Sequence, residues 1–457
     1  MENYTAKELV EMQREFFMTG VTRPLDYRYG ALGLLKKALQ ENEKRIADAL
    51  YSDLHKHPME SYMCETGLVL DEIGYHMKHL AGWMKDKRVK TPLAQFRSKS
   101  FVSPEPYGVV LIMAPWNYPL QLCLEPLIGA ISAGNCAVLK PSAYAPATSH
   151  LLAEIIGSCF EPEYIAVKEG GRAENTDLLA QRFDYIFFTG SVDVGKVVME
   201  AAAKHLTPMS LELGGKSPVI VDQTADLKVA ARRIAFGKCI NSGQTCVEPD
   251  YLLIQENVRD RFIECYKDAL KEFFPDGSKE QMCRIISEKH YKNKKALLEG
   301  QKAAVGGGFD DSERLIEPTL LIDVDPASPV MQEEIFAPIL PVITFSQIDE
   351  AIDFVRSREK PLAFYLFTTD AETEKKVLDS CSFGGGCIND TIIHLATPYM
   401  GFGGVGNSGM GQYHGKLSFD TFTHYRSIVK KAYSPDLKMR YLPYTDSNFN
   451  MIRKFLK

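Results

Sequence analysis

The sequence predicts an α/β protein with two tandem doubly wound, Rossmann-like domains and a small bridging element for oligomerisation. Short, continuous apolar runs alternate with helical segments, and the alternation starts afresh after Glu212. Strands that are buried on both faces read as continuous apolar runs, so the pattern indicates parallel sheets covered by helices on both sides. A chain of 457 residues is also too long for one core, and it should divide into two or three domains with a cleft between them.

The first hundred residues are expected to be mainly helical. Leu32, Leu35, Leu39, Ile46 and Leu50 recur at helical spacing with charged residues between them. Basic residues and prolines then interrupt the pattern at residues 87–106, which we interpret as a crossing segment or a projecting ribbon.

The first group of buried strands is expected at residues 107–116, 136–141 and 184–190, each followed by a helix. Four strand–helix pairs follow in the second half of the chain. They are predicted at residues 217–240, 251–274, 339–358 and 362–381. No repeat of solenoid period is visible.

Composition argues against several classes of partner. A net charge of −6, with 45% hydrophobic and 25% charged residues, gives no reason to expect nucleic acid or an acidic membrane surface. The N-terminus lacks the pattern of a secretory signal, and the most apolar stretch, residues 120–139, contains Gln, Glu and Asn. We therefore expect a soluble, cytoplasmic protein.

The ten cysteines are scattered, with no C-x-x-C pair, and should be reduced in a cytoplasm. Cys381, Cys387 and His394 are the rival candidates for a zinc site. Their spacing fits none of the usual ligand patterns, so no metal is expected.

Two glycine-rich stretches compete as phosphate-binding turns. "GFGGVG" at Gly401–Gly406 matches G-x-G-x-x-G, but no strand leads into it and no apolar helix follows, so we interpret it as a loop. In "FFTGSVDVGK" a buried strand ends at Thr189 and a helix begins near Val192. The free N–H groups of that helix end would suit a pyrophosphate, and Gly190 and Gly195 would permit close approach.

Three residues are candidates for chemistry. Asn117 follows an apolar strand, where its amide could donate to an oxyanion, although a turn role before Pro119 is as plausible from the residues alone. Glu212 lies in an apolar strand beside two glycines, which suits a carboxylate of raised pKa. Cys246 lies on a loop between helix and strand, which gives a nucleophile access, whereas Cys239 belongs to the preceding helix.

These residues carry a resemblance. "APWNYPL", "FTGSVDVGK", "LELGGKSP", "GQTC", "EEIFAPILPV" and "FGGVGNSGMG" occur in the order and spacing of the aldehyde dehydrogenase superfamily. The likeness covers essentially the whole chain and is greatest to the class 3 branch, which acts on aromatic and medium- or long-chain aliphatic aldehydes.

The resemblance implies that Cys246 attacks the aldehyde carbon, with Asn117 and the Cys246 backbone N–H holding the oxyanion. Hydride transfer to NAD or NADP would leave a thioester, which water activated by Glu212 would hydrolyse. Glu334 remains an alternative base. The implied cofactor-binding residues are Lys140, Gly190, Ser191, Gly195, Glu334, Phe336 and Trp116.

The resemblance also implies the domain organisation. Residues 1–82 and 104–211 would bind NAD(P), and residues 212–400 would form the catalytic domain. Residues 83–103 and 401–457 would bridge the subunits of a homodimer.

Two residues depart from the family pattern. Ala143 stands where relatives often carry an acid that pairs with a ribose hydroxyl, so we expect NADP to be tolerated as well as NAD. Glu248 stands where relatives usually have a small residue, and we expect it to point to solvent rather than toward the thiol.

Two other functions remain open. A CoA-acylating aldehyde dehydrogenase would pass the acyl group to CoA, but such enzymes often lack the residue that corresponds to Glu212. A cysteine hydrolase would use Cys246 with His394 or His414 as base and would need no nucleotide. The physiological aldehyde is not evident from the sequence.

Overall fold

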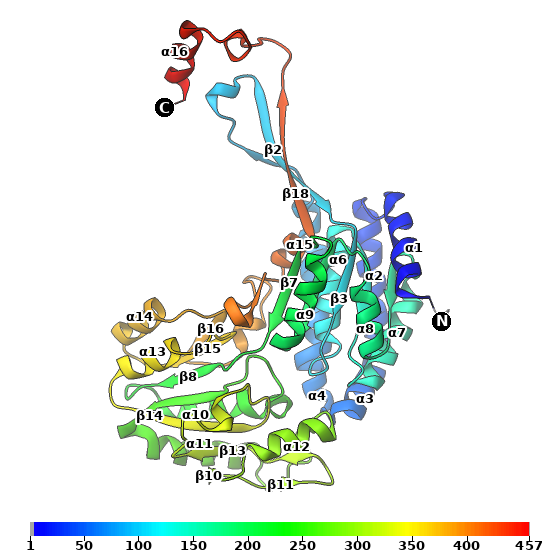
Figure 1. Cartoon of the computed structure of the whole chain (residues 1–457). Coiled ribbons are helices and arrows are strands. Elements are labelled where there is room, and N and C mark those ends of the chain that lie inside the picture. Colours follow the sequence, from blue (N-terminus) through cyan, green and yellow to red (C-terminus); the bar gives the residue numbers. More distant parts are fainter. Residues whose placement is uncertain (1–3, 457) are drawn as a thin grey trace.

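Two parallel sheets and a projecting arm organise the chain (Figure 1), in a computed structural model that describes residues 4–456. The first sheet has the order β17-β7-β6-β3-β4-β5, and the second β10-β13-β14-β9-β8-β15-β16. Only the edge strands β17 and β10 run antiparallel to their neighbours. The predicted fold class, with two doubly wound Rossmann-like units, is confirmed.

The strands of the first sheet are β3 (Val109–Met113), β4 (Cys136–Lys140), β5 (Ile165–Val167), β6 (Tyr185–Gly190), β7 (Met209–Leu213) and β17 (Gly409–Met410). Its helices are α1 (Ala6–Met18), α2 (Leu25–Glu41), α3 (Glu43–Leu54), α4 (Pro58–Ser61), α5 (Gly67–Trp83), α6 (Gln121–Ala133), α7 (Pro146–Cys159), α8 (Arg172–Leu179), α9 (Val192–Ala203) and α15 (Lys416–Thr421), with a π-helical turn at Tyr62–Thr66. Helices α1, α8 and α9 contact one another over one face of the sheet, and α2, α5, α6 and α7 do so over the other.

This sheet winds both ways from β3. β4 and β5 follow on one side of β3, while β6 and β7 follow on the other. Asn117 lies just beyond the carboxyl end of β3, and Ser191 just beyond that of β6. Open α/β sheets bind their ligands at such a switch point, so the topology brings two predicted site segments to the expected edge.

The strands of the second sheet are β8 (Pro218–Val221), β9 (Tyr251–Gln255), β10 (Lys302–Val305), β13 (Thr319–Ile322), β14 (Ile339–Phe345), β15 (Ala363–Phe367) and β16 (Gly385–Ile388). Its helices are α10 (Leu227–Cys239), α11 (Arg259–Phe273), α12 (Glu288–Ala296), α13 (Ile348–Arg356) and α14 (Ala371–Ser380), and a small hairpin joins β11 (Phe309–Asp310) to β12 (Leu315–Ile316). Helices α10 and α11 pack together, as do α13 and α14.

The arm is a three-stranded antiparallel sheet of β1 (Lys87–Val89), β2 (Ser98–Pro106) and β18 (Thr423–Lys431), with α16 (Asp446–Phe455) beyond it. It stands away from both parallel sheets (Figure 1). The projecting ribbon expected at residues 87–106 is therefore present, and a strand from the C-terminal region completes it.

Two details differ from the simplest division of the chain. β7 runs through residue 212, so the expected boundary at that residue cuts a strand of the first sheet. β17 pairs with β7, and α15 packs on α6, so residues 401–421 do not join the arm. The assignment of the two parts to cofactor binding and catalysis stays a prediction.

Candidate active site

The cysteine loop connects α10 to β9 and has a constrained backbone. Asn241, Ser242 and Gly243 are consecutive residues in the left-handed region, with φ of 48°, 52° and 70°. A Cβ on Gly243 would lie 2.5 Å from the backbone of Ala337, so glycine permits this close approach as well as the positive φ. The turn places Cys246 just before β9.

Gln244 holds the loop in this shape. Its side-chain amide donates to the carbonyls of Asn241 and Arg284, each at 3.0 Å, and its oxygen accepts from the N–H of Ile286, also at 3.0 Å. The amide is fully buried, so all three bonds form away from competing water. Gln244 lies in the "GQTC" motif, which could have singled it out, but its role as a brace depends on residues about 40 positions away.

Asn117 reaches this loop from the other sheet. Its side-chain nitrogen donates to the carbonyl of Gln244 at 3.0 Å, and its own carbonyl accepts from the Asn241 side chain at 2.8 Å. A side-chain amide carries two hydrogens, so the second remains available to a ligand. The tertiary structure therefore brings Asn117 and the loop of Cys246 together, as the resemblance implied.

A buried ion pair behind Asn117 was not predicted. Lys56 and Glu65 are fully buried with 2.5 Å between Nζ and Oε1, and Lys56 also donates to the carbonyl of Asn117 at 3.2 Å. Glu65 accepts from the N–H groups of Leu120 and Gln121 at 2.9 and 3.3 Å. The pair thus fixes the carbonyl of Asn117 and the backbone that follows it. Its sequence context, "HKHPMESYMCET", carries no recognisable spacing.

Glu212 is a buried carboxylate with neither oxygen hydrogen-bonded to a described residue. It lies in β7, opposite Gly409 of β17. Burial raises the pKa of its carboxyl well above the usual range, which favours the neutral form at rest. A buried polar group without partners implies a water or a substrate atom beside it, so Glu212 has the environment expected of a proton acceptor.

The thiol of Cys246 is partly buried. Burial raises its pKa, and the nearby carboxyls of Glu334 and Glu212 raise it further. The resting thiol is therefore neutral, and its reactive thiolate needs a base.

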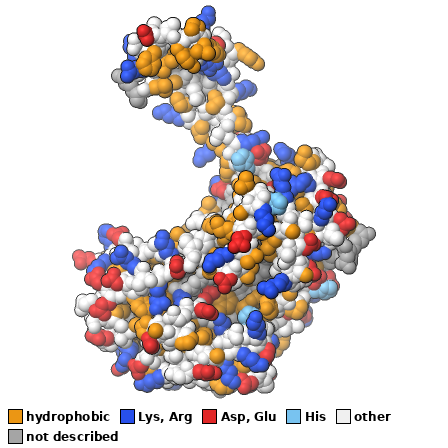
Figure 2. Space-filling view, viewed as in Figure 1, with side chains coloured by type: hydrophobic (Ala, Val, Ile, Leu, Met, Phe, Trp, Pro, Cys, Tyr) orange, Lys and Arg blue, Asp and Glu red, His pale blue; other side chains and the backbone are white. Residues whose placement is uncertain are grey.

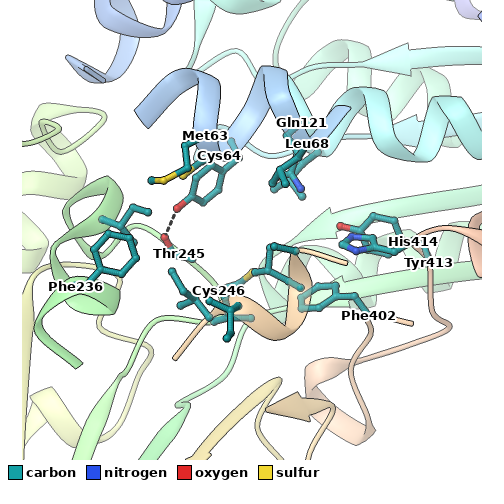
Figure 3. Close-up of a pocket in the computed structure, with 18 residues that line it drawn as sticks. Met63, Cys64, Leu68, Gln121, Phe236, Thr245, Cys246, Phe402, Tyr413 and His414 are labelled. Carbon is teal, nitrogen blue, oxygen red and sulfur yellow. Dashed lines mark hydrogen bonds between the residues drawn. The ribbon is translucent and has the colours of Figure 1, made fainter. Parts of the chain in front are cut away.

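An apolar cavity of about 180 Å³ opens beside Cys246 (Figure 3). The hydroxyl of Tyr118 is hydrogen-bonded to that of Thr245 at 2.6 Å along one wall. The lining includes Met63, Cys64, Leu68, Leu122, Phe236, Ile240, Ile392, Leu395 and Phe402. Such a cavity suits a hydrophobic small molecule whose reactive end meets the sulfur.

A second cavity, of about 730 Å³, lies between the two sheets and is lined by Ser191, Gly214, Lys216, Glu334 and Arg358 among others. Ser191 precedes α9 and its hydroxyl makes no capping bond, so the helix end is open to an anion. The carboxylate of Glu334 accepts from the N–H of Gly215 at 3.4 Å, and burial raises its pKa to about 8.

Gly190 and Gly195, which we expected to permit close approach of a pyrophosphate, are also required by packing within the chain. A Cβ at Gly190 would lie 2.6 Å from the Phe188 ring, and one at Gly195 would lie 2.7 Å from the Leu213 side chain. Close packing within the chain thus accounts for both. The strand–turn–helix itself is as predicted, with β6 ending at Gly190 and α9 beginning at Val192.

Lys140 ends β4 at the same edge of the first sheet and donates to the carbonyls of Pro141 and Gly170 at 2.8 and 2.6 Å. Burial lowers its pKa. Phe336 meets the ring of Trp116 edge-on, with centroids 5.4 Å apart. Of the residues that the resemblance assigned to the cofactor, Ser191 and Glu334 line the second cavity.

Our expectation for Glu248 was wrong. The side chain is buried and does not point to solvent, because its Oε2 lies 2.8 Å from Nζ of the fully buried Lys238. Its other oxygen accepts from the N–H of Phe336 at 2.8 Å. The buried carboxylate of Glu248 is therefore paired with Lys238, a residue of α10.

The two histidines of the hydrolase alternative are engaged elsewhere. Nε2 of His414 lies 3.2 Å from the carboxylate of Glu125, and Nδ1 of His394 lies 3.6 Å from the sulfur of Cys387. Within residues 4–456, no group of three or more His, Cys, Asp or Glu side chains is arranged to hold a metal ion.

Comparison with known proteins shows the family of the chain. Residues 3–428 match the aldehyde dehydrogenase family. The chain is also 48% identical over 448 residues to the 4,4'-diaponeurosporen-aldehyde dehydrogenase of Staphylococcus aureus, and the match covers 97% of each chain. The chain belongs to the aldehyde dehydrogenase family. It is thus an oxidoreductase, as predicted.

Other relatives bear on the branch and the cofactor. The dimeric NADP-preferring aldehyde dehydrogenase of Rattus norvegicus is 46% identical, over 93% of this chain and 94% of the relative. The substrate-bound structure of Staphylococcus aureus AldH matches with a TM-score of 0.97 and 46% identity over 100% of both chains. The NAD-dependent aldehyde dehydrogenase of Sinorhizobium meliloti matches with a TM-score of 0.85 and 27% identity, over 94% of this chain and 88% of that one. The predicted resemblance to the class 3 branch and the dependence on NAD or NADP are confirmed.

Proposed function

We propose that Cys246 is the nucleophile of an aldehyde oxidation that yields the carboxylic acid. The observation that carries this proposal is the placement of a partly buried thiol at an apolar cavity, within electrostatic reach of a buried carboxylate that has no partner, Glu212. The sulfur attacks the aldehyde carbon and forms a thiohemiacetal. Because the pKa of the thiol is raised, its proton must pass to a base or to water as the S–C bond forms.

Asn117 and the backbone N–H of Cys246 stabilise the oxygen that becomes negatively charged. The side chain of Asn117 is already oriented by its bond to Gln244, so it needs no reorganisation when the charge develops. In other enzymes a donor of this kind lowers the activation barrier by roughly 3–4 kcal/mol. Lys56 supports the same site by holding the Asn117 carbonyl.

NAD or NADP, when bound, accepts the hydride that leaves the substrate carbon, and a thioester then remains on Cys246. Glu212 takes a proton from water, and the resulting hydroxide attacks the thioester carbon. The C–S bond breaks and the carboxylic acid is released, while the proton held by Glu212 passes to the leaving sulfur and restores the thiol. A carboxyl with a raised pKa is a stronger base once ionised, which suits this step.

The cavity lined by Ser191 and Glu334 is proposed as part of the cofactor site. The open N-terminus of α9 suits a pyrophosphate, because its N–H groups and dipole favour an anion. Lys140 and Glu334 would hold the two riboses, and Gly190 and Gly195 permit the turn. Phe336 and Trp116 would form the aromatic surroundings of the nicotinamide.

These residue roles imply that the part of the chain around the first sheet binds the cofactor and the part around the second sheet carries the catalytic cysteine. Residues 1–82 and 104–211 supply the cofactor-binding part, and most of residues 212–400 supply the catalytic part. The aromatic and aliphatic lining of the cavity beside Cys246 favours an aromatic or a medium- to long-chain aliphatic aldehyde.

The arm is proposed to bridge the two subunits of a homodimer. Leu93, Tyr433, Leu442 and Tyr444 are between 73% and 103% exposed, and apolar side chains gather at its end (Figure 2). Exposed apolar surface of this kind is typical of protein contacts. The rat relative, which carries "dimeric" in its name, supports the proposal.

We propose that the protein resides in the cytoplasm. Its ten cysteines are all free, as expected where thiols stay reduced. No helix among residues 4–456 combines the length and apolar character needed to span a bilayer.

Single-turnover oxidation of benzaldehyde, hexanal and a long-chain aldehyde tests the mechanism. In this assay, NADH formation is followed spectrophotometrically. Cys246→Ala should abolish the burst of NADH while leaving NADH binding intact, and Cys239→Ala is the matched control. Normal oxidation by Cys246→Ala would refute the mechanism, and acyl-CoA formation on addition of CoA would favour an acylating enzyme instead.

A further inference from the structure

Two carboxylates on the cysteine loop bind the backbone of the segment that carries Glu334 and Phe336. Glu248 accepts from the N–H of Phe336 at 2.8 Å, and Asp250 accepts from the N–H of Ile335, also at 2.8 Å. Charged acceptors form stronger hydrogen bonds than neutral ones. The cysteine loop is therefore tied to residues 335–336 at two adjacent points.

Direct backbone contact reinforces this connection. A Cβ on Gly243 would lie 2.5 Å from the carbonyl carbon of Ala337 and 2.5 Å from Oε2 of Glu248. The two segments thus touch without an intervening side chain. Any shift of one segment must move the other or break the Glu248 contact.

Phe336 has a conformation that needs such support. Its φ of 52° lies in the left-handed region, which is unfavourable for a bulky residue without local stabilisation. The N–H bonded to Glu248 belongs to this same residue. The ring then meets Trp116, the neighbour of Asn117, edge-on at 5.4 Å.

Lys238 forms a buried ion pair with the carboxylate of Glu248. Both side chains are at most 1% exposed, and their charged atoms are 2.8 Å apart. Asp250 has a cation of its own, because its carboxylate is paired with Lys216. Glu248 therefore has one oxygen for Lys238 and one for Phe336.

We propose that Glu248 is a positioning residue that sets the place of Phe336, and with it the nicotinamide end of the cofactor site, relative to Cys246. Lys238 holds the carboxylate, the carboxylate holds the Phe336 backbone, and the backbone directs the ring toward Trp116. The proposal rests on the proposed roles of Cys246 and Phe336.

The test compares two double variants, Lys238→Met/Glu248→Gln and Lys238→Met/Glu248→Met. Both remove the buried charges and keep the side-chain length at position 248, but only Gln retains an oxygen that can accept the Phe336 N–H. NADH binding is measured by fluorescence, and the reaction of iodoacetamide with Cys246 is measured without cofactor. Asp222→Asn is the control, because Asp222 is a buried carboxylate of the same sheet that accepts the N–H of Thr224 and lines none of the cavities described above.

We expect the Met variant to bind NADH at least about tenfold more weakly than the Gln variant, while iodoacetamide reacts at similar rates with both. Asp222→Asn should bind NADH normally. Equal NADH affinity in the two double variants, or an equal loss in Asp222→Asn, would overturn the proposal.

A third variant keeps the proposal testable if either double variant fails to fold. Glu248→Asp keeps the charge beside Lys238 but shortens the side chain by one methylene, and it should also weaken NADH binding. Unchanged affinity in this variant would likewise count against the positioning role. Because affinity is measured without turnover, these outcomes are separate from the Cys246→Ala result, which tests the proposed function itself.

Discussion

The side-chain amide of Asn117 donates to the carbonyl of Gln244, two residues before Cys246, at 3.0 Å. Asn117 follows a strand of the first sheet and Gln244 precedes a strand of the second, so this bond helps to join the two halves of the site. The bond uses one amide hydrogen and directs the other. The side chain of Asn117 is thus held in one orientation.

Asn117→Ala should lower kcat/KM for aldehyde oxidation by about 100- to 1,000-fold, roughly 3–4 kcal/mol, because one preorganised donor is lost. Steady-state kinetics with hexanal measure the effect. Thermal denaturation serves as the control, since the variant also leaves the Gln244 carbonyl without this partner. A loss below tenfold would mean that Asn117 has no role in oxyanion stabilisation.

Glu212→Gln should preserve the burst of NADH and slow the steady-state rate by at least about 100-fold, because only hydrolysis needs this base. Rapid-quench detection of the acyl-enzyme by mass spectrometry should find the thioester on Cys246. The equivalent change at Glu334 is the comparison, since it is the other candidate base. If Glu334→Gln stalls at the thioester and Glu212→Gln does not, the two assignments must be exchanged.

Alkylation of Cys246 by iodoacetamide should accelerate with increasing pH into the alkaline range. The thiol pKa is raised by burial and by the neighbouring carboxyls, so the thiolate forms only at high pH. The carboxyl of Glu334, with a pKa of about 8, is ionised where the thiol begins to titrate and opposes a second negative charge. Glu334→Gln should therefore shift the rise to lower pH, and an unchanged profile would contradict this account.

NADP should be used as well as NAD, because Ala143 puts no carboxylate against a 2′-phosphate. Ala143 is exposed and lies three residues after Lys140, at the edge of the first sheet. Ratios of kcat/KM for the two cofactors measure the preference. Ala143→Glu should disfavour NADP by repulsion. A preference of the unaltered enzyme for NAD above about a hundredfold, roughly 2.7 kcal/mol, would refute this prediction.

Stability should fall as pH decreases from about 6.5 toward 4, in part through His394. Burial, and then the proximity of His414, lowers the pKa of His394 from 6.5 to about 4. The unfolded chain therefore binds a proton in this window that the folded chain does not, which favours unfolding by roughly 3 kcal/mol at most. His394→Gln should flatten the acid side of a urea-denaturation series. Identical pH dependence in both proteins would exclude this contribution.

Local patterns were sufficient for much of the fold. Continuous apolar runs predicted β3, β4 and β6, and the turn after β6 was placed correctly because strand, glycine and helix start are adjacent in the chain. The ribbon at β1 and β2 was also anticipated, since basic residues and prolines interrupt the helical spacing. Its third strand, β18, pairs across more than three hundred residues and left no local signal.

The site residues likewise divide into those with a local sequence signal and those that depend on long-range contacts. The order of motifs, together with a cysteine on a loop and a glutamate in an apolar strand, was enough to name Cys246, Glu212 and Asn117. Lys56 and Glu65 were missed because their pairing depends on how a π-helical turn packs beneath Asn117.

What the sequence determined by itself was the fold class and the family, because these depend on residue type and order along the chain. The roles it assigns to Cys246, Glu212 and Asn117 stay predictions. The tertiary structure alone decided that Glu248 is buried against Lys238 and bonded to Phe336, and that Glu212 has no partner. The physical reason is that burial, and with it the pKa and pairing of a charge, is a property of the surrounding atoms. Those atoms come from distant segments that only folding brings together.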